Sequence, residues 1–102
     1  MSGVATDGSS GSSLRAGRLA RLTGLYAITP DLDDTPRLVA LCAAALDGGA
    51  VAIQYRNKSA PPALAFEQAK ALVALARGRG ALLIVNDDPA LAARVDADGV
   101  HV

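Results

Sequence analysis

The chain alternates short apolar runs with amphipathic stretches, and this alternation limits its possible folds more than any other feature. Four apolar runs have the composition of strands: residues 25–29, 50–55, 82–85 and 100–102. Between them, apolar residues recur at the spacing of one helix face. Because such alternation implies parallel strands joined by right-handed crossovers, the sequence predicts an α/β fold of parallel β-α repeats. Two architectures fit, an open doubly wound sheet and the first half of a TIM (β/α)8 barrel, since a whole barrel needs about 250 residues.

A capping residue directly before a proline marks two helix starts, at Thr35-Pro36 and Asp88-Pro89. The pair Gly48-Gly49 should end the first of these helices. The residues predicted to face the core from the first two helices are Leu38, Leu41, Cys42, Ala45, Leu46, Ala65, Ala69, Leu72, Val73 and Ala76. The run from Leu82 to Val85 is apolar without alternation, which is typical of a strand covered on both faces.

Composition excludes several kinds of partner. The formal net charge is zero, so no whole-chain basic field draws the protein to nucleic acid or to an acidic membrane surface. No run approaches the roughly 20 apolar residues of a membrane span. The single cysteine, Cys42, is interpreted as a core residue, and one cysteine without a disulfide partner fits a cytoplasmic protein. Residues 1–22, which start with mostly small polar residues, are predicted to be a flexible leader to a domain at 23–102.

Two cations and an amide leave the second predicted strand on the same side. Because successive strand residues point to opposite faces, Gln54, Arg56 and Lys58 share one face. Arginine offers a planar fork and lysine a compact charge, and both suit a phosphorylated ligand. The alternative is that Arg56 and Lys58 simply leave the strand and enter solvent.

A second polar pair, Asn86-Asp87, stands at the end of the next strand. Asn86 shares a strand face with Ile84, and we expect this face to be the interior one. Since ligands bind where parallel strands end, both pairs should lie at one mouth. Asp87 could hold Mg2+, which takes one or two carboxylates and completes its shell with water and phosphates, or it could merely form a turn. We interpret Asp88 as a helix cap and His101 as a packed histidine.

Four segments resemble the thiamine phosphate synthase family, in order and in approximate spacing: Leu25–Asp31, Val51–Lys58, Leu83–Asp87 and Ala97–Val102. The family is a (β/α)8 barrel, a transferase that joins a pyrimidine diphosphate to a thiazole phosphate, uses Mg2+ and releases pyrophosphate. The resemblance implies that Gln54, Arg56, Lys58 and Asn86 bind the diphosphate substrate and that Asp87 is a magnesium ligand. It assigns no catalytic residue. Asn57 stands where the family commonly has Glu, on the strand face opposite the binding groups.

The resemblance also implies what is missing. The family has a second acidic magnesium ligand and four more strands after the Gly-Val-His segment, so the thiazole phosphate site should be absent. We therefore expect an inactive amino-terminal fragment of a synthase, or a truncated gene product. Exposed strand edges around Leu25 and Val100 invite self-association.

Three alternatives stay open. The related thiazole tautomerase shares the barrel but often lacks the glutamine found here at position 54. The presence of Gln54 therefore favours the synthase. A second alternative is a binding or assembly remnant without catalysis. The third is an unrelated, small, doubly wound phosphate-binding module.

Overall fold

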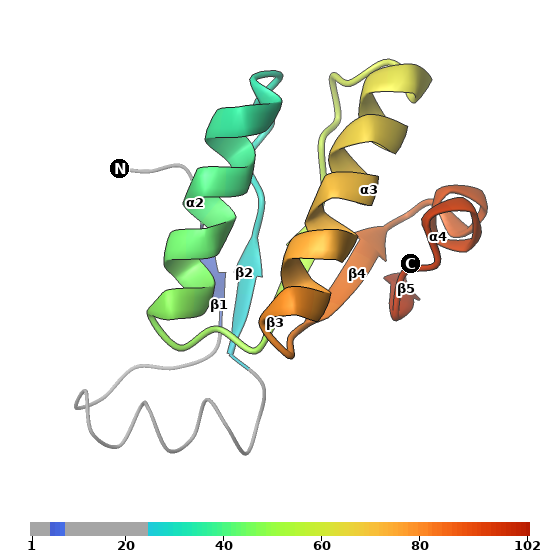
Figure 1. Cartoon of the computed structure of the whole chain (residues 1–102). Coiled ribbons are helices and arrows are strands. Elements are labelled where there is room, and N and C mark those ends of the chain that lie inside the picture. Colours follow the sequence, from blue (N-terminus) through green and yellow to red (C-terminus); the bar gives the residue numbers. More distant parts are fainter. Residues whose placement is uncertain (1–4, 8–24) are drawn as a thin grey trace.

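The computed structural model describes residues 5–7 and 25–102, and within them one five-stranded sheet runs in the order β1-β2-β3-β4-β5 (Figure 1). The strands are β1 (Ala5–Asp7), β2 (Tyr26–Ile28), β3 (Ala52–Tyr55), β4 (Leu82–Asn86) and β5 (Gly99–His101). The helices are α2 (Thr35–Asp47), α3 (Pro62–Gly78) and α4 (Pro89–Val95). Strands β2 to β5 are parallel, which confirms the predicted repeat of parallel β-α units.

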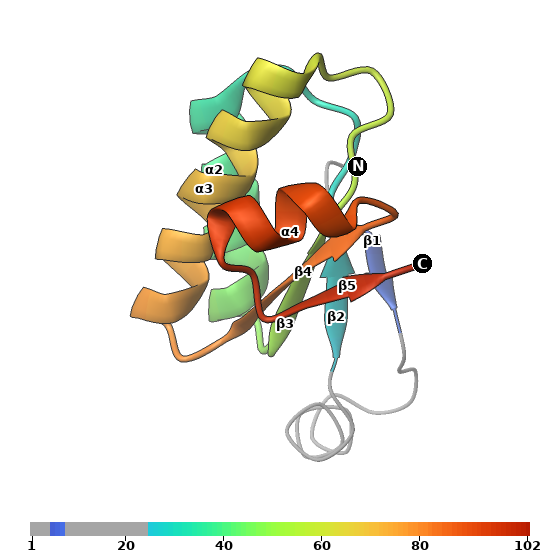
Figure 2. The same ribbon diagram turned by 90° about the vertical axis from the view of Figure 1, so that its right-hand side faces the viewer.

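The helices pack on one face of the sheet, where α2 contacts α3 and α3 contacts α4 (Figure 2). Their buried residues join those of the strands in one apolar cluster. A doubly wound sheet would carry helices on both faces. The arrangement is therefore that of part of a (β/α)8 barrel, whose helices form an outer layer.

Burial alternates along β4 and along the second half of β3, because the helices cover only one face of the sheet. In β3, Ile53 and Tyr55 are buried against the helices, whereas Gln54 is half-buried on the opposite face. In β4, Leu83 and Val85 are likewise buried. The expectation that residues 82–85 are covered on both faces is wrong, since 47% of Leu82 is exposed and Ile84 is only half-buried.

One sheet edge differs from the prediction. Strand β1 pairs antiparallel with β2, so that Ala5 lies opposite Ile28 and Asp7 opposite Tyr26. The predicted exposed edge of β2, around Leu25, is therefore occupied, and the described sheet ends in β1 on that side and in β5 on the other. The rest of the predicted leader, residues 1–4 and 8–22, lies outside the described residues, and the domain boundary stays a prediction.

The helix ends follow the predicted chemistry with one shift. Asp88 caps α4, as predicted, and its Oδ1 accepts a hydrogen bond from the backbone N of Leu91 at 2.9 Å. At α2 the cap is Asp34 rather than Thr35, because the Asp34 carboxylate accepts from the backbone N of Arg37 at 3.1 Å. Thr35 is therefore the first helical residue. At the other end, Gly48 is the C-cap.

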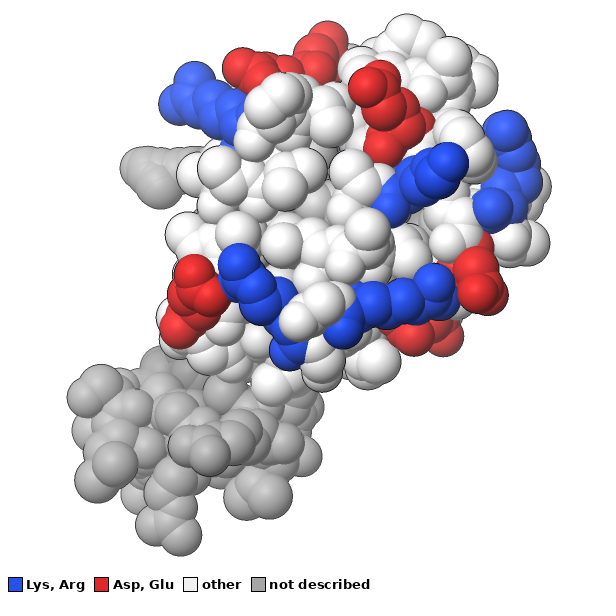
Figure 3. Space-filling view, in the orientation of Figure 1, with Lys and Arg blue, Asp and Glu red and all other residues white. Residues whose placement is uncertain are grey.

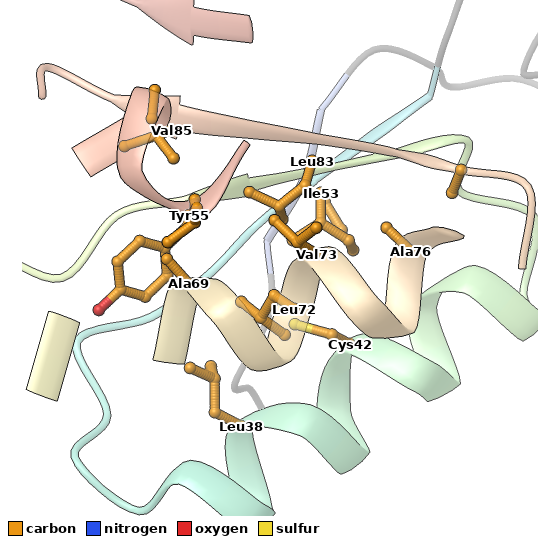
Figure 4. Close-up of a cluster of buried hydrophobic side chains, with 14 of the residues drawn as sticks. Leu38, Cys42, Ile53, Tyr55, Ala69, Leu72, Val73, Ala76, Leu83 and Val85 are labelled. Atoms are coloured by element: carbon orange, nitrogen blue, oxygen red, sulfur yellow. The ribbon is translucent and has the colours of Figure 1, made fainter. Parts of the chain in front are cut away.

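The core lies between the sheet and the helices α2 and α3 (Figure 4). Its largest fully buried side chains include Leu38, Ile53, Leu72 and Leu83. Cys42 is also buried, as predicted for a core residue, and burial raises the pKa of its thiol to about 11. Within the described part of the chain, no helix combines the length and hydropathy that crossing a membrane requires.

Candidate functional site

A pocket of about 350 Å3 opens where β3 and β4 end. It is lined by Arg56, Asn57, Lys58, Asn86 and Asp87. Both strands are parallel and adjacent, so their carboxyl ends reach the same rim of the sheet. This is where ligands bind in parallel α/β folds. We call this pocket the strand-end pocket.

An amide pair connects the two strands at this pocket. The Nε2 of Gln54 donates to the Oδ1 of Asn86 at 2.8 Å, on the sheet face away from the helices. The Nδ2 of Asn86 in turn lies 3.3 Å from the Oδ2 of Asp87 and donates to it. All five residues predicted from the sequence are therefore together, four lining the pocket and Gln54 bonded to one of them. Their roles toward a ligand stay predictions.

Asp87 adopts an unusual backbone conformation, with φ of 58°. Non-glycine residues rarely adopt positive φ, and Asp is one of the types that do so most readily. Its backbone N donates to the carbonyl of His101 at 2.7 Å, while its side chain is exposed beside the pocket. Since Asp88 supplies the helix cap, the carboxylate of Asp87 is not needed for that purpose.

The strand-end pocket carries positive charge. Within residues 25–102 the two ion pairs join Arg77 to Asp96 and Arg79 to Asp47, so neither Arg56 nor Lys58 is paired there. On the face seen in Figure 3, over α2 and α3, acidic and basic side chains are interspersed instead. The two cations of the pocket are therefore a local feature rather than part of a wider basic surface on the face seen in Figure 3.

Metal binding would depend on few protein ligands. Residues 5–7 and 25–102 contain no group of three His, Cys, Asp or Glu side chains that could hold a metal ion. Asp87 is the one carboxylate that lines the pocket. This donor set fits Mg2+, which is often held by one or two carboxylates and by the phosphates of a substrate.

The backbone of the loop after β3 is held by side chains that the sequence reasoning did not assign. Thr29 is only 2% exposed, and its Oγ1 accepts from the N of Arg56 at 2.8 Å and donates to the O of Arg56 at 3.0 Å. The Oδ1 of Asp31 accepts from the N of Lys58 at 3.0 Å. The signal for Thr29 was its position, two residues after Ala27 on the buried face of β2.

His101 is not packed, contrary to the sequence-based expectation. Its side chain is exposed, because β5 is an edge strand of the described sheet and His101 pairs with Asn86, whose side chain lies on the face away from the helices. Its Nδ1 lies 3.4 Å from the Oδ1 of Asn86, next to the strand-end pocket.

A second hollow of about 260 Å3 lies between the starts of α3 and α4 and shares Asn57 and Asn86 with the first. Alanines and other apolar residues form much of its wall, and Arg94 is its one cation. That guanidinium is already placed 4.3 Å from the centre of the Phe66 ring. The second hollow is therefore less suited to an anion than the strand-end pocket.

Comparisons with known proteins agree on one family. The sequence profile of the family described as thiamine monophosphate synthase matches residues 25–102. A thiamine-phosphate synthase of Chromobacterium violaceum is 57% identical over 82 residues, which are 80% of this chain and 40% of that protein. Those of Methylobacillus flagellatus and Xylella fastidiosa are 55% and 51% identical, over 82% and 87% of this chain and 40% and 38% of their own lengths. The chain thus spans about two fifths of the length of these curated relatives.

Proposed function

The chain belongs to the thiamine monophosphate synthase family, and on that premise we propose that it carries the diphosphate-binding part of a transferase. The transferase would join a pyrimidine diphosphate to a thiazole phosphate in thiamine biosynthesis, with release of pyrophosphate. The observation that carries this proposal is the strand-end pocket, where two cations without an ion pair in residues 25–102, two amides and a carboxylate line one space at the ends of adjacent parallel strands.

Each residue has a proposed role that follows from its chemistry. Arg56 and Lys58 bind the diphosphate oxygens, Arg56 through paired N–H groups and Lys58 as a mobile charge. Gln54 and Asn86, already bonded to each other at 2.8 Å, present their remaining amide groups to the same substrate. Asp87 holds Mg2+, which would supply positive charge to the phosphates when bound.

The proposed chemistry favours positive groups that are already close to the phosphates when the substrate binds. Breaking a carbon–oxygen bond to expel pyrophosphate builds negative charge on the leaving group. Positive groups that are already in place stabilise that charge without reorganising during the reaction. The backbone N–H groups of Arg56 and Lys58 donate to Thr29 and Asp31, and these hydrogen bonds hold the backbone from which both cations extend.

The metal requirement is the first test. Titration calorimetry of the 102-residue chain with the pyrimidine diphosphate, and with inorganic pyrophosphate, should show binding about 10-fold tighter or more with Mg2+ than in excess chelator. Asp87→Asn should abolish this difference. The matched control is Asp88→Asn, which removes the neighbouring charge while asparagine still caps α4. Equal affinity in chelator and in Mg2+ for the unaltered chain would refute the proposal.

Turnover is a separate matter. We propose that these 102 residues bind the diphosphate without catalysing the transfer, since they span about two fifths of the relatives and bring one carboxylate to the pocket. An assay of thiamine phosphate formation by the chain alone should therefore give no product. Measurable synthesis by this chain would contradict the expectation.

Location and assembly belong to the same proposal. The buried thiol of Cys42 supports a cytoplasmic protein, because no disulfide is needed to stabilise the core. The unpaired edge of β5, with Val100 40% exposed, is the surface that we propose for self-association.

A further inference from the structure

The side chain of Gln68 is completely buried in the middle of α3, although it is polar. Its Oε1 accepts hydrogen bonds from the Tyr55 hydroxyl at 2.7 Å and from the Asn57 Nδ2 at 3.1 Å. Its Nε2 donates to the carbonyl of Leu32 at 2.8 Å. Because burial raises the pKa of Tyr55 to about 12, the tyrosine remains a proton donor at neutral pH. The amide of Gln68 therefore has a partner for each of its two polar atoms.

These bonds reach the strand-end pocket through Asn57. The Nδ2 of Asn57 donates to Gln68 and also to the carbonyl of Leu32 at 3.3 Å. Its Oδ1 accepts from both the N and the Oγ of Ser59 at 3.1 Å. Asn57 thus connects the interior of the helical layer to the loop of residues 56–59, between the two cations of the pocket.

Packing alone does not explain a buried amide at position 68. The neighbouring core positions of α3 are filled by Ala69, Leu72, Val73 and Ala76. Burying an amide costs free energy unless its hydrogen bonds are made, and an apolar residue at position 68 would remove the partner of the Tyr55 hydroxyl and of the Asn57 amide. One consequence of the amide is that Gln68, together with the carbonyl of Leu32, holds the Nδ2 of Asn57.

The same loop is anchored at each of its other residues. Thr29 holds the backbone of Arg56, Asp31 holds that of Lys58, and Asn57 holds that of Ser59. A loop held in its binding conformation loses less conformational entropy when a ligand arrives, which increases affinity. Gln68 is the buried end of the anchor that runs through Asn57.

We propose that Gln68 is a positioning residue for the anion-binding loop, residues 56–59, and that it acts through Asn57 to increase affinity for a diphosphate. The assignment of the ligand rests on the proposed function of the strand-end pocket. The positioning itself rests on the hydrogen bonds from Gln68 to Asn57 and from Ser59 to Asn57.

The test compares two substitutions that remove different bonds from the same amide. Gln68→Leu removes the anchor of Asn57, whereas Tyr55→Phe removes one donor to Gln68 and leaves the Asn57 bond in place. In the 102-residue chain, 15N order parameters of residues 57–59 should fall from about 0.85 toward 0.6 in Gln68→Leu only. The Kd for inorganic pyrophosphate with Mg2+ should rise about 2- to 10-fold in the same variant.

A double variant separates positioning from a merely structural role. If Gln68 acts through Asn57, then Gln68→Leu combined with Asn57→Ala should bind pyrophosphate no more weakly than Asn57→Ala alone. Unchanged order parameters in Gln68→Leu, or an equal loss in Tyr55→Phe, would overturn the proposal. If the loop loosens in Gln68→Leu but Arg56→Ala does not affect pyrophosphate binding, the positioning holds and the proposed function fails. Should Gln68→Leu fail to fold, Gln68→Met is the second variant, with the same expected results.

Discussion

Arg56→Ala should weaken the binding of inorganic pyrophosphate in the presence of Mg2+ about 10- to 150-fold. The estimate follows from the roughly 1.5–3 kcal/mol that hydrogen bonds to charged groups contribute, at tenfold per about 1.4 kcal/mol. The fold should be unaffected, because Thr29 holds the backbone of residue 56 and not its side chain. Calorimetric titration gives the affinity, and far-UV circular dichroism checks the fold.

Arg79→Ala is the matched control, since it removes the same charge from an exposed arginine at the end of α3. Arg79 pairs with Asp47 and lies outside the strand-end pocket, so its replacement should leave the affinity within about twofold. Arg56→Lys should be intermediate, because a lysine keeps the charge but not the planar fork. Equal losses in Arg56→Ala and Arg79→Ala would mean that overall charge, rather than the pocket, attracts the anion.

Leu72→Ala is expected to cost about 2–5 kcal/mol of the free energy of unfolding. Leu72 is fully buried in α3 at the centre of the cluster shown in Figure 4. Truncation removes apolar contact area and leaves a cavity, and close-packed cores relax only partly around such a cavity. Since domains are typically stable by only about 5–15 kcal/mol, urea denaturation should show a large fall in the midpoint.

Leu82→Ala is the control, because it makes the same substitution at a partly exposed leucine. The Leu82 side chain is 47% exposed on the uncovered side of β4, so its truncation should cost about 1 kcal/mol or less. If the two variants unfolded at the same urea concentration, α3 would not be packed on the sheet as described. The pair thus tests which side of the sheet is the core.

The alternation of apolar runs and helix-spaced residues is enough to predict the order and direction of the main strands. Each run is bounded by residues with strong local preferences, such as Asp88-Pro89 before α4 and Gly48 after α2. The positions of the site residues are predictable for the same reason, because each lies at the end of a strand or in the loop that follows it. Gln54 and Asn86 share a strand face, and this places them within hydrogen-bond distance once the strands are adjacent.

Other features depend on partners that are distant in the chain, and local patterns do not reveal them. Thr29 and Gln68 are both buried on otherwise apolar faces, although polar residue types alone suggest exposure to solvent. Their partners, Arg56 and Asn57, are 27 and 11 residues away. The prediction of Thr35 as the cap of α2 was wrong because Asp34, one residue earlier, is also of a good capping type, and its carboxylate accepts from the N of Arg37.

The antiparallel pairing of β1 with β2 decides where the run of parallel strands can be extended. Strand β2 has a neighbour on both sides, and β1 is antiparallel to it, so a further strand can extend the run of parallel strands β2 to β5 only beside β5. If such a strand runs parallel to β5, its carboxyl end will lie next to His101 and Asp87. Whatever functional groups it carries there would be delivered to the rim that already holds Arg56 and Lys58.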